Sequence, residues 1–253
     1  MLGCGASTGV PTIGPDWGRC DPADRRNRRL RGSVLIESRG RTLLIDTSPD
    51  LRQQLLTAGV ARIDAVLLTH AHADHLHGID DLRVVNRLMK QPIPLYGNAA
   101  TLAEVGQRFG YALRAPPKDA GFYRPTLTAR EICGPFEAAG LPIVPFDQDH
   151  GFSTTLGFRI GAFGYSTDVT EFGEAAFAAL AGVEAWIVDC LRREPHPTHS
   201  HLAKTVSWVK RVRPQRAILT HMDQSFDYRE LAAELPAGIE PGYDGLEFEL
   251  PDP

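Results

Sequence analysis

The hexapeptide HAHADH, His70–His75, constrains this chain more than any other segment, because it gathers three imidazoles and a carboxylate within six residues. It follows the apolar run Ala65–Thr69, whose leucine-rich and β-branched composition is typical of a buried strand. The motif is therefore expected in a loop at the carboxyl end of a strand, where α/β folds tend to place ligand sites. Imidazole and carboxylate together suit zinc, iron, nickel or manganese. The motif predicts a metal site, and a solvated polar turn is the weaker alternative.

The length and composition are those of one large α/β domain or two small ones, since 253 residues with 43% hydrophobic content can form a sizeable core. No apolar run approaches the roughly 18 residues of a membrane span, so no membrane partner is expected. A net charge of -4 gives no general attraction to nucleic acid.

The cysteines Cys4, Cys20, Cys133 and Cys190 lie far apart, with no closely spaced pair. This spacing argues against a disulfide framework and against a zinc site built from cysteines. The chain opens without the basic and apolar segments of a signal peptide, so we expect a cytoplasmic location. Met1 falls within an expected strand, and we therefore expect a few native residues to precede it.

Five arginines crowd the segment Arg25–Arg31. One interpretation is a solvated surface loop, because local basic patches are common on protein surfaces. The other is a loop that faces phosphate, because guanidinium groups match the geometry of phosphate oxygens. The sequence alone does not decide between the two.

The N-terminal half alternates strand and helix patterns around the histidine motif. The glycine-rich turn Gly3–Pro11 lacks the lysine and spacing of nucleotide-binding loops, and its glycines would let backbone pass close to a metal pocket. Thr47–Asp50 carries the hydroxyls, proline and acid of a helix start, and this helix should end at Gly59. We interpret the loop Ala115–Pro125 as a lid. The other expected strands are Ser33–Ser38, Arg41–Asp46 and Pro92–Tyr96, and the other expected helices are Gly78–Lys90 and Thr101–Phe109.

In the C-terminal half, polar residues again follow expected strands. His150, Asp168 and His221 each come shortly after a different strand candidate. A single histidine after a strand is usually a surface or hydrogen-bonded residue, but shared placement at strand ends favours a common site. The strand candidates are Ile143–Phe146, Thr154–Ile160, Ala162–Tyr165, Ala185–Val188 and Arg216–Leu219, and the helix candidates are Phe172–Leu180 and Leu202–Val212.

Taken together, these motifs resemble the metallo-β-lactamase superfamily over nearly the whole chain. The resemblance implies an α/β fold of four layers, the αβ/βα sandwich, formed by residues 1–253 as a single domain. Within the superfamily the chain resembles the PhnP-like phosphodiesterases, which hydrolyse 5-phosphoribosyl 1,2-cyclic phosphate and other phosphodiesters and are related to the tRNA-processing ribonucleases Z. The segments that carry this second resemblance are Gly3–Pro11 (GCGASTGVP), Asp46–Asp50 (DTSPD), Leu219–His221 (LTH) and Tyr243–Gly245 (YDG).

The same resemblance implies two divalent metal ions per chain, zinc or manganese. Two such ions can share a hydroxide and stabilise charge in an in-line phosphoryl displacement, in which Asp74 would hold a metal and the proton of the hydroxide. Asp46 would lie behind the ligands and orient one of the histidines, the alternative being a helix-capping or structural aspartate. The implied ligands are His70, His72 and His150 for one ion, Asp74, His75 and His221 for the other, and Asp168 as the bridge.

The leaving oxygen needs a proton, and the segment His196–His201 lies where the phosphodiesterase relatives carry a histidine general acid. Alignment on the helix that follows makes His199 the first choice, His201 the second and His196 the third. General acid catalysis is typically worth about 10²–10⁴-fold in rate. The alternative is that these histidines only cap or solvate the loop.

Two features found among the relatives are missing from this sequence. Some PhnP relatives hold a structural zinc with three cysteines in the first loop and a later histidine, but here that loop has only Cys20 and the later position is Gln224. We therefore expect no structural zinc. The long basic and glycine-rich arm with which ribonucleases Z grip tRNA is also missing, so nucleic acid is a less favoured partner.

The sequence thus predicts a dinuclear metal hydrolase that acts on a small phosphodiester, such as a cyclic ribosyl phosphate or a nucleotide-like diester. The alternatives are a nuclease of the ribonuclease Z type, a lactone or thioester hydrolase of the same fold, and a metal-binding module without activity. The arginine segment is a candidate for holding a terminal phosphate, and a homodimer is the assembly to consider.

Overall fold

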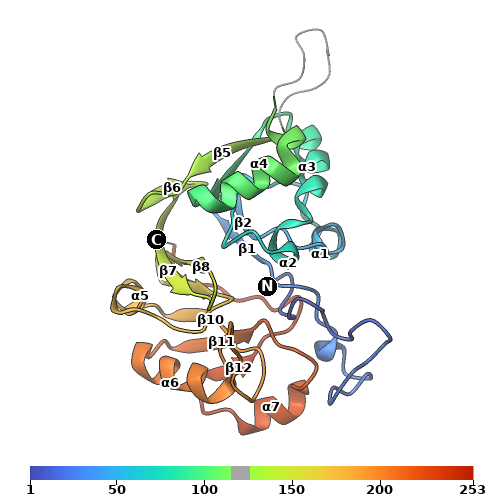
Figure 1. Ribbon diagram of the computed structural model, residues 1–253, viewed down its shortest axis with the longest axis vertical. Coiled ribbons are helices and arrows are strands. Elements are labelled where there is room, and N and C mark those ends of the chain that lie inside the picture. Colours follow the sequence, from blue (N-terminus) through green and yellow to red (C-terminus); the bar gives the residue numbers. More distant parts are fainter. Residues whose placement is uncertain (115–125, 253) are drawn as a thin grey trace.

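The computed structural model describes residues 1–114 and 126–252, so the lid expected at Ala115–Pro125 lies outside the described residues. Within them, two sheets form the middle of the molecule and helices cover their outer faces (Figure 1). This arrangement is the four-layered sandwich that the sequence predicts. No helix in the described ranges has the length and apolar character needed to span a membrane.

The first sheet is built around the strand that precedes the histidine motif. Its order is β1-β2-β3-β4-β5, with β1 antiparallel to β2 and the other neighbours parallel. All three residues of the central strand β3 are buried, as its apolar sequence predicts. The strands are β1 (Val34–Ser38), β2 (Arg41–Ile45), β3 (Ala65–Leu67), β4 (Ile93–Gly97) and β5 (Leu127–Glu131).

The second sheet has the order β12-β11-β10-β9-β8-β7-β6. Strands β9 to β12 run parallel to one another, whereas β6 to β9 form an antiparallel meander. The parallel part places several strand ends at the same edge of the sheet. The strands are β6 (Phe136–Ala138), β7 (Leu141–Asp149), β8 (Thr154–Ile160), β9 (Phe163–Ser166), β10 (Ala185–Asp189), β11 (Arg216–Thr220) and β12 (Ile239–Pro241).

Most helix positions agree with the sequence patterns, but several bounds differ. The expected helix Leu202–Val212 is confirmed as α6, whereas the expected helix Gly78–Lys90 is wrong as one unit. That segment holds the short 3-10 helix Ile79–Asp81 and then α3, because a 3-10 turn also satisfies a helical apolar pattern. The helices are α1 (Leu51–Ala58), α2 (Ala73–Leu76), α3 (Leu82–Met89), α4 (Ala99–Leu113), α5 (Glu174–Leu180), α6 (Leu202–Val212) and α7 (Tyr228–Glu234).

The start of α1 differs from the expected capping pattern. Asp50 is the N-cap residue, but its side chain makes no capping hydrogen bond within the described helix start. Its carboxylate instead accepts hydrogen bonds from the backbone and guanidinium of Arg31, at 2.9 Å each. The helix does end where expected, because Gly59 takes the left-handed conformation that closes it.

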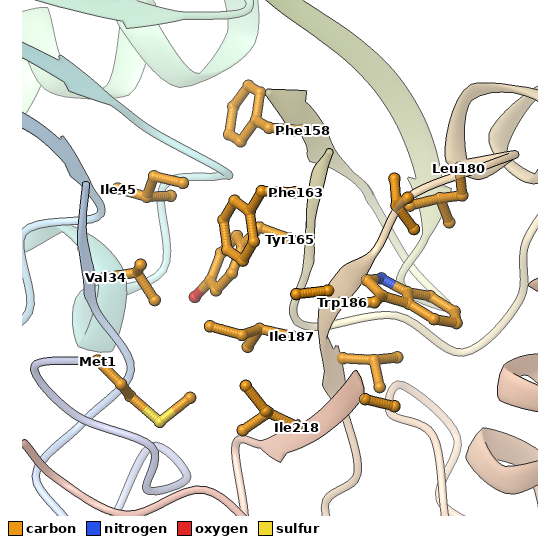
Figure 2. Packing of buried hydrophobic residues seen from close by; sticks show 14 of the residues in the cluster. Met1, Val34, Ile45, Phe158, Phe163, Tyr165, Leu180, Trp186, Ile187 and Ile218 are labelled. Carbon is orange, nitrogen blue, oxygen red and sulfur yellow. The ribbon is translucent and has the colours of Figure 1, made fainter. Parts of the chain in front are cut away.

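The main hydrophobic core lies between the two sheets. Figure 2 shows Val34 and Ile45 of the first sheet facing Tyr165 and Ile187 of the second. Trp186 points to the opposite face of β10, as the alternation along a strand requires, and its indole nitrogen donates to Ser166 Oγ at 3.1 Å. The single domain over residues 1–253 stays a prediction.

The arginine segment and the glycine-rich turn pack against each other and against the C-terminal part of the chain. Arg29 is 1% exposed and donates to the backbone oxygens of Asp223 at 3.0 Å and Phe226 at 2.6 Å. Neither a solvated nor a phosphate-facing interpretation therefore fits Arg29. Gly3 is needed for close backbone packing, because a Cβ there would lie 2.1 Å from Arg31 O. The expected close approach of backbone is thus confirmed at Gly3, where the neighbour is the backbone of Arg31 and not a ligand candidate.

Cys20 and Gln224, the two positions on which the prediction of no structural zinc rests, lie in this region. Cys20 Sγ contacts the backbone oxygens of Gln224 at 3.5 Å and Phe226 at 3.1 Å, and it lies 3.8 Å from the Arg29 guanidinium. Arg29 and Cys20 thus join the first loop to the segment after β11 through hydrogen bonds. The absence of a structural zinc stays a prediction.

Asp244 is a second link between the chain ends. Its carboxylate accepts hydrogen bonds from the backbone of Cys4 at 3.1 Å and of Leu30 at 2.7 Å. Burial raises the pKa of Asp244 to about 7, against the smaller opposing effect of these hydrogen bonds. The folded protein therefore binds this proton more tightly than the unfolded chain does.

This raised pKa predicts how stability depends on pH. Below about pH 4 the carboxyl is protonated in both states, and the free energy of unfolding falls as the pH rises from about 4 to about 7. Between pH 5 and pH 8 this residue should cost about 2–3 kcal/mol of stability. Urea unfolding of the wild type and of Asp244→Asn at both pH values measures the effect as a difference. Parallel pH profiles of the two proteins would contradict the prediction.

Candidate metal centre

The ligand candidates meet where strands of both sheets end. The histidine motif follows β3, and Asp46 follows β2, the parallel neighbour of β3. From the second sheet, His150 follows β7, Asp168 lies just beyond β9 and His221 follows β11. The two sheets therefore deliver their side chains to one place between them, which is the convergence that the sequence predicts.

The first group of candidate ligands contains His70, His72, His150 and Asp168. One donor atom from each lies within 4.8 Å of the others. His70 Nε2 and His150 Nε2 are each 3.8 Å from Asp168 Oδ1, and His150 Nε2 is 3.4 Å from His72 Nδ1. His70 and His150 thus face the same oxygen of the carboxylate, and His72 lies beside His150.

The second group contains Asp74, His75, His221 and again Asp168. Here the facing atom is the other carboxylate oxygen of Asp168, Oδ2, which lies 3.0 Å from His75 Nε2 and 3.5 Å from His221 Nε2. Asp74 Oδ2 is 3.3 Å from His75 Nε2 and 3.4 Å from His221 Nε2. Asp168 therefore faces each group with a different oxygen, as a bridging ligand must.

The separations between these donor atoms fit a divalent cation. Ligands at about 2.1 Å around a tetrahedral zinc lie about 3.4 Å from one another. The observed distances of 3.0 to 3.8 Å are close to this value. In addition, His70 Nε2 and His75 Nε2 are buried and make no hydrogen bond to any described residue, although carboxylate oxygens are near. Buried nitrogens without hydrogen bonds that converge on shared carboxylates are suited to a metal ion.

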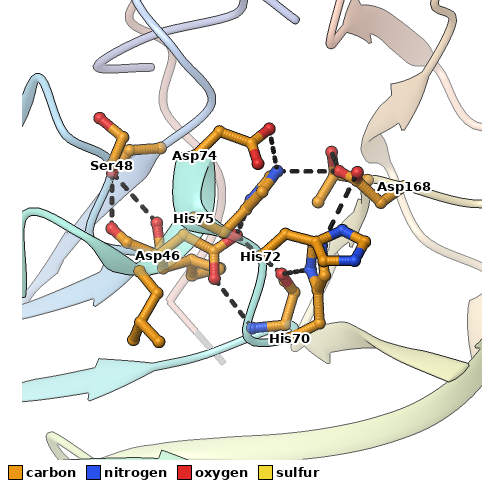
Figure 3. Close-up of polar contacts among 12 residues, drawn as sticks. Asp46, Ser48, His70, His72, Asp74, His75 and Asp168 are labelled. Carbon is orange, nitrogen blue, oxygen red and sulfur yellow. Dashed lines mark hydrogen bonds and ion pairs between the residues drawn. The ribbon is translucent and has the colours of Figure 1, made fainter. Parts of the chain in front are cut away.

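His70 and His75 each make a hydrogen bond through Nδ1, on the side of the ring away from the site, which leaves their Nε2 atoms free. Asp46 Oδ2 lies 2.7 Å from His75 Nδ1 and also accepts from Thr69 Oγ1 at 2.8 Å. The Thr69 hydroxyl oxygen in turn lies 3.0 Å from His70 Nδ1. Figure 3 shows His75 between Asp46 and Asp168. The arrangement places the proton of each imidazole on Nδ1 and thereby aims its Nε2 at the site.

The carboxylates of the site favour positive charge nearby. Burial alone would raise the pKa of Asp74, but His75 and His221 lower it well below its usual range. Burial likewise would lower the pKa of His221, but Asp168, Asp74 and Asp189 outweigh it and raise the pKa to about 9. At neutral pH the carboxylates of Asp74 and Asp168 are therefore ionised, and they attract cations.

Several site residues adopt a backbone conformation that is rare for residues other than glycine. The φ angles of Asp46, Asp168 and His221 are +62°, +53° and +59°, in the left-handed region. Each of these residues follows the last residues of a strand, where the chain turns sharply toward the site. Such strain persists where the surrounding structure fixes it, and it often accompanies function.

A cleft of about 380 Å³ opens onto these ligands. His199 lines it with a side chain that is 12% exposed, and its Nε2 atom is 3.8 Å from Asp168 Oδ1. The His199 ring stacks on the ring of His221 at 4.7 Å. The remaining described residues along the cleft are Ser7, His72, Asp74, His150, Phe152, Ser153, Asp168, Thr198 and His221.

The other two candidates for the general acid are placed differently from His199. His201 is the N-cap residue of α6 and does not belong to the described lining of the cleft. His196 Nδ1 lies 3.3 Å from the backbone nitrogen of Thr198, and its ring is 5.2 Å from that of His199. Of the three histidines, His199 is the one in the described lining of the cleft, and its role as the general acid stays a prediction.

One residue of the site was missed by the sequence analysis. Asp189 ends the buried strand β10 and lies near both His199 and His221. The available signal was a carboxylate at the end of a wholly apolar run, since a buried carboxylate needs a partner.

Comparisons with known proteins agree with this geometry. A family model of the β-lactamase superfamily domain matches residues 41–222. A solved diphosphatase from the PhnP family is 35% identical with a TM-score of 0.89, and the match covers 97% of this chain and 93% of that one. Octanoyltransferase from Porphyromonas gingivalis is 34% identical over 98% of this chain, which spans only 50% of that relative. Ribonuclease Z from Mycobacterium bovis is 26% identical over 94% of each chain.

The family model covers well over half of the chain, and the sheets and ligand groups agree with it, so the chain belongs to the metallo-β-lactamase superfamily. Within the superfamily it is PhnP-like, which confirms the resemblance predicted from its motifs. It is thus a member of this superfamily with groups of histidine and aspartate that suit divalent metal ions.

Proposed function

We propose that this protein is a metal-dependent phosphodiesterase that hydrolyses a small phosphodiester, such as a cyclic ribosyl phosphate or a nucleotide-like diester. The observation that carries the proposal is the placement of Asp168, whose two oxygens face two separate ligand groups beside His199 in one cleft. The similarity to a PhnP-family diphosphatase and to ribonuclease Z supports phosphate chemistry. Two bound divalent cations would supply an acidic water and stabilise charge on the phosphoryl group.

Residues of the chain would transfer the protons and orient the ligands. Asp74 faces both the second ligand group and the cleft, so its carboxylate can hold a proton next to the reacting phosphorus. His199 lies on the same cleft and can donate a proton to the leaving oxygen. Asp46 keeps His75 in the orientation that its role as a ligand requires.

The alternatives differ in the substrate they would take. A nuclease of the ribonuclease Z type would bind oligonucleotides in a strongly salt-dependent way, because it must contact several phosphates. A lactone or thioester hydrolase would act on carboxylic esters and would need no proton donor matched to a phosphate diester. The similarity to a diphosphatase adds the diphosphate linkage as a substrate to compare.

The deciding assay is hydrolysis of bis(p-nitrophenyl) phosphate against p-nitrophenyl phosphate after reconstitution with Mn²⁺ or Zn²⁺, with metal counted per chain. We expect diester hydrolysis with two metals bound and much slower monoester hydrolysis. ADP-ribose serves as the diphosphate-linked comparison, and γ-thiobutyrolactone serves as the ester comparison. A folded protein with two metals that cleaves the lactone but neither phosphate diester nor diphosphate would overturn the proposal.

A further inference from the structure

Asp189 has a buried carboxylate oxygen that accepts no hydrogen bond from any described residue. The residue is fully buried, and its Oδ2 atom accepts a hydrogen bond from the backbone of Ser200 at 2.8 Å. The other oxygen, Oδ1, lies 3.6 Å from His199 Nδ1 and 3.8 Å from His221 Nδ1. None of these three atoms has a hydrogen-bond partner among the described residues, although all three are buried. Three polar atoms without partners therefore converge on one point.

The ring geometry explains how one oxygen can serve both histidines. The rings of His199 and His221 stack at 4.7 Å with an angle of only 13° between their planes, so their Nδ1 edges face the same oxygen. A carboxylate oxygen has two lone pairs and can accept from both. The distances exceed hydrogen-bond length by a few tenths of an ångström, and such bonds often tighten when a site is filled.

We propose that Asp189 is a positioning residue that keeps the proton of both His199 and His221 on Nδ1. When a cation is bound at the site, His221 would present an unprotonated Nε2 to it. His199 would present an Nε2 that can gain and lose a proton there. His221 Nε2 faces Asp74 and Asp168, whereas His199 Nε2 faces Asp168. One carboxylate thus couples a metal-ligand candidate to the candidate general acid, and the roles of the two histidines rest on the proposed function.

A cation bound by Asp189, His199 and His221 is the competing explanation, since these three residues also offer ligand atoms within 4.8 Å of one another. It would require His221 to ligate through both ring nitrogens, because Nε2 already faces Asp74 and Asp168. A neutral imidazole has only one unprotonated nitrogen. The geometry therefore favours protons rather than a cation at this point.

The test is histidine ¹⁵N NMR of the zinc-loaded protein, which distinguishes a proton on Nδ1 from one on Nε2. His199 signals are assigned by their loss in His199→Ala. We expect the Nδ1-protonated form in the wild type and a shift toward the Nε2-protonated form in Asp189→Asn, whose amide cannot accept from both rings while also accepting from Ser200. Zinc affinity of the weaker site should fall about 10–100-fold in the same variant.

Thr205→Val is the matched control. Thr205 Oγ1 donates to the backbone oxygen of Asp189 at 2.7 Å, so this variant loosens the same strand end but keeps the carboxylate. It should leave the His199 proton on Nδ1 and zinc affinity unchanged. A shift as large as that of Asp189→Asn would reduce the role of Asp189 to support of the loop and overturn the proposal.

Two further results on the wild-type protein would also overturn it. One is a neutral His199 whose single proton is on Nε2, and the other is a third tightly bound zinc per chain with His199 as a ligand. If the tautomers are as expected but no phosphate substrate is hydrolysed, the proposed function fails and the positioning role of Asp189 stands.

Discussion

Replacing Asp168 with asparagine is expected to reduce the tightly bound metal from two ions per chain to at most one. Asp168 faces one ligand group with Oδ1 and the other with Oδ2, whereas asparagine offers a single ligating oxygen. Its amide nitrogen cannot take the place of the second oxygen. Asparagine also tolerates the left-handed backbone found at this position, with φ of +53°, so the fold should persist.

The effect of Asp168→Asn on phosphodiester hydrolysis should be about 10³-fold or larger, because the charge stabilisation by a metal pair is worth several kcal/mol. Metal is counted by elemental analysis after dialysis, and rates are measured with the diester substrate. Asp147→Ala is the matched control, because it removes an exposed carboxylate from β7, another strand of the same sheet. That control should keep two metals and the wild-type rate. Two tightly bound metals in Asp168→Asn would exclude a bridging role.

The ligand groups were predictable because each of their residues follows an apolar strand. The run before His70 reads as a buried strand, and it is one. His150, Asp168 and His221 follow other strands that the sequence also indicates. Side chains at the ends of parallel strands gather at one edge, so a local pattern was enough to predict a long-range cluster.

The elements that the sequence analysis missed are short or carry little apolar periodicity. Strand β5, Leu127–Glu131, buries only its first residue, so its sequence shows no alternation of apolar and polar residues. Helix α2 spans Ala73–Leu76 inside the metal motif, where polar ligand candidates take the place of a periodic apolar pattern. The strands β6 and β12 have three residues each, which is too few for a periodic signal.

Arg29 and Asp189 show why a charged residue is hard to interpret from sequence alone. Arg29 lies in an arginine-rich segment that reads as surface, yet its partners are backbone oxygens about 200 positions later. Asp189 ends an apolar strand, and its partners follow on two later segments. In both cases burial is set by contacts between distant parts of the chain, which no local pattern encodes.

The second large effect is expected from His199→Ala, which should lower hydrolysis of a phosphodiester with an alkoxide leaving group by about 10²–10⁴-fold while both metals are retained. His199 lines the cleft beside Asp168 but belongs to neither of the ligand groups that share this residue. Loss of its imidazole therefore removes a proton donor without removing a candidate ligand of either group. Metal content per chain is the measurement that separates this effect from that of Asp168→Asn.

The dependence on the leaving group makes the His199 prediction specific. An alkoxide leaving group, as in a 2′,3′-cyclic nucleotide, needs a proton, whereas p-nitrophenolate is a stable anion and needs little assistance. The loss in His199→Ala should thus be large for the cyclic nucleotide and small for bis(p-nitrophenyl) phosphate. His201→Ala, at the N-cap of α6, is the control and should leave both rates near the wild-type values. Equal losses for both substrates would show that His199 positions the substrate and does not donate the proton.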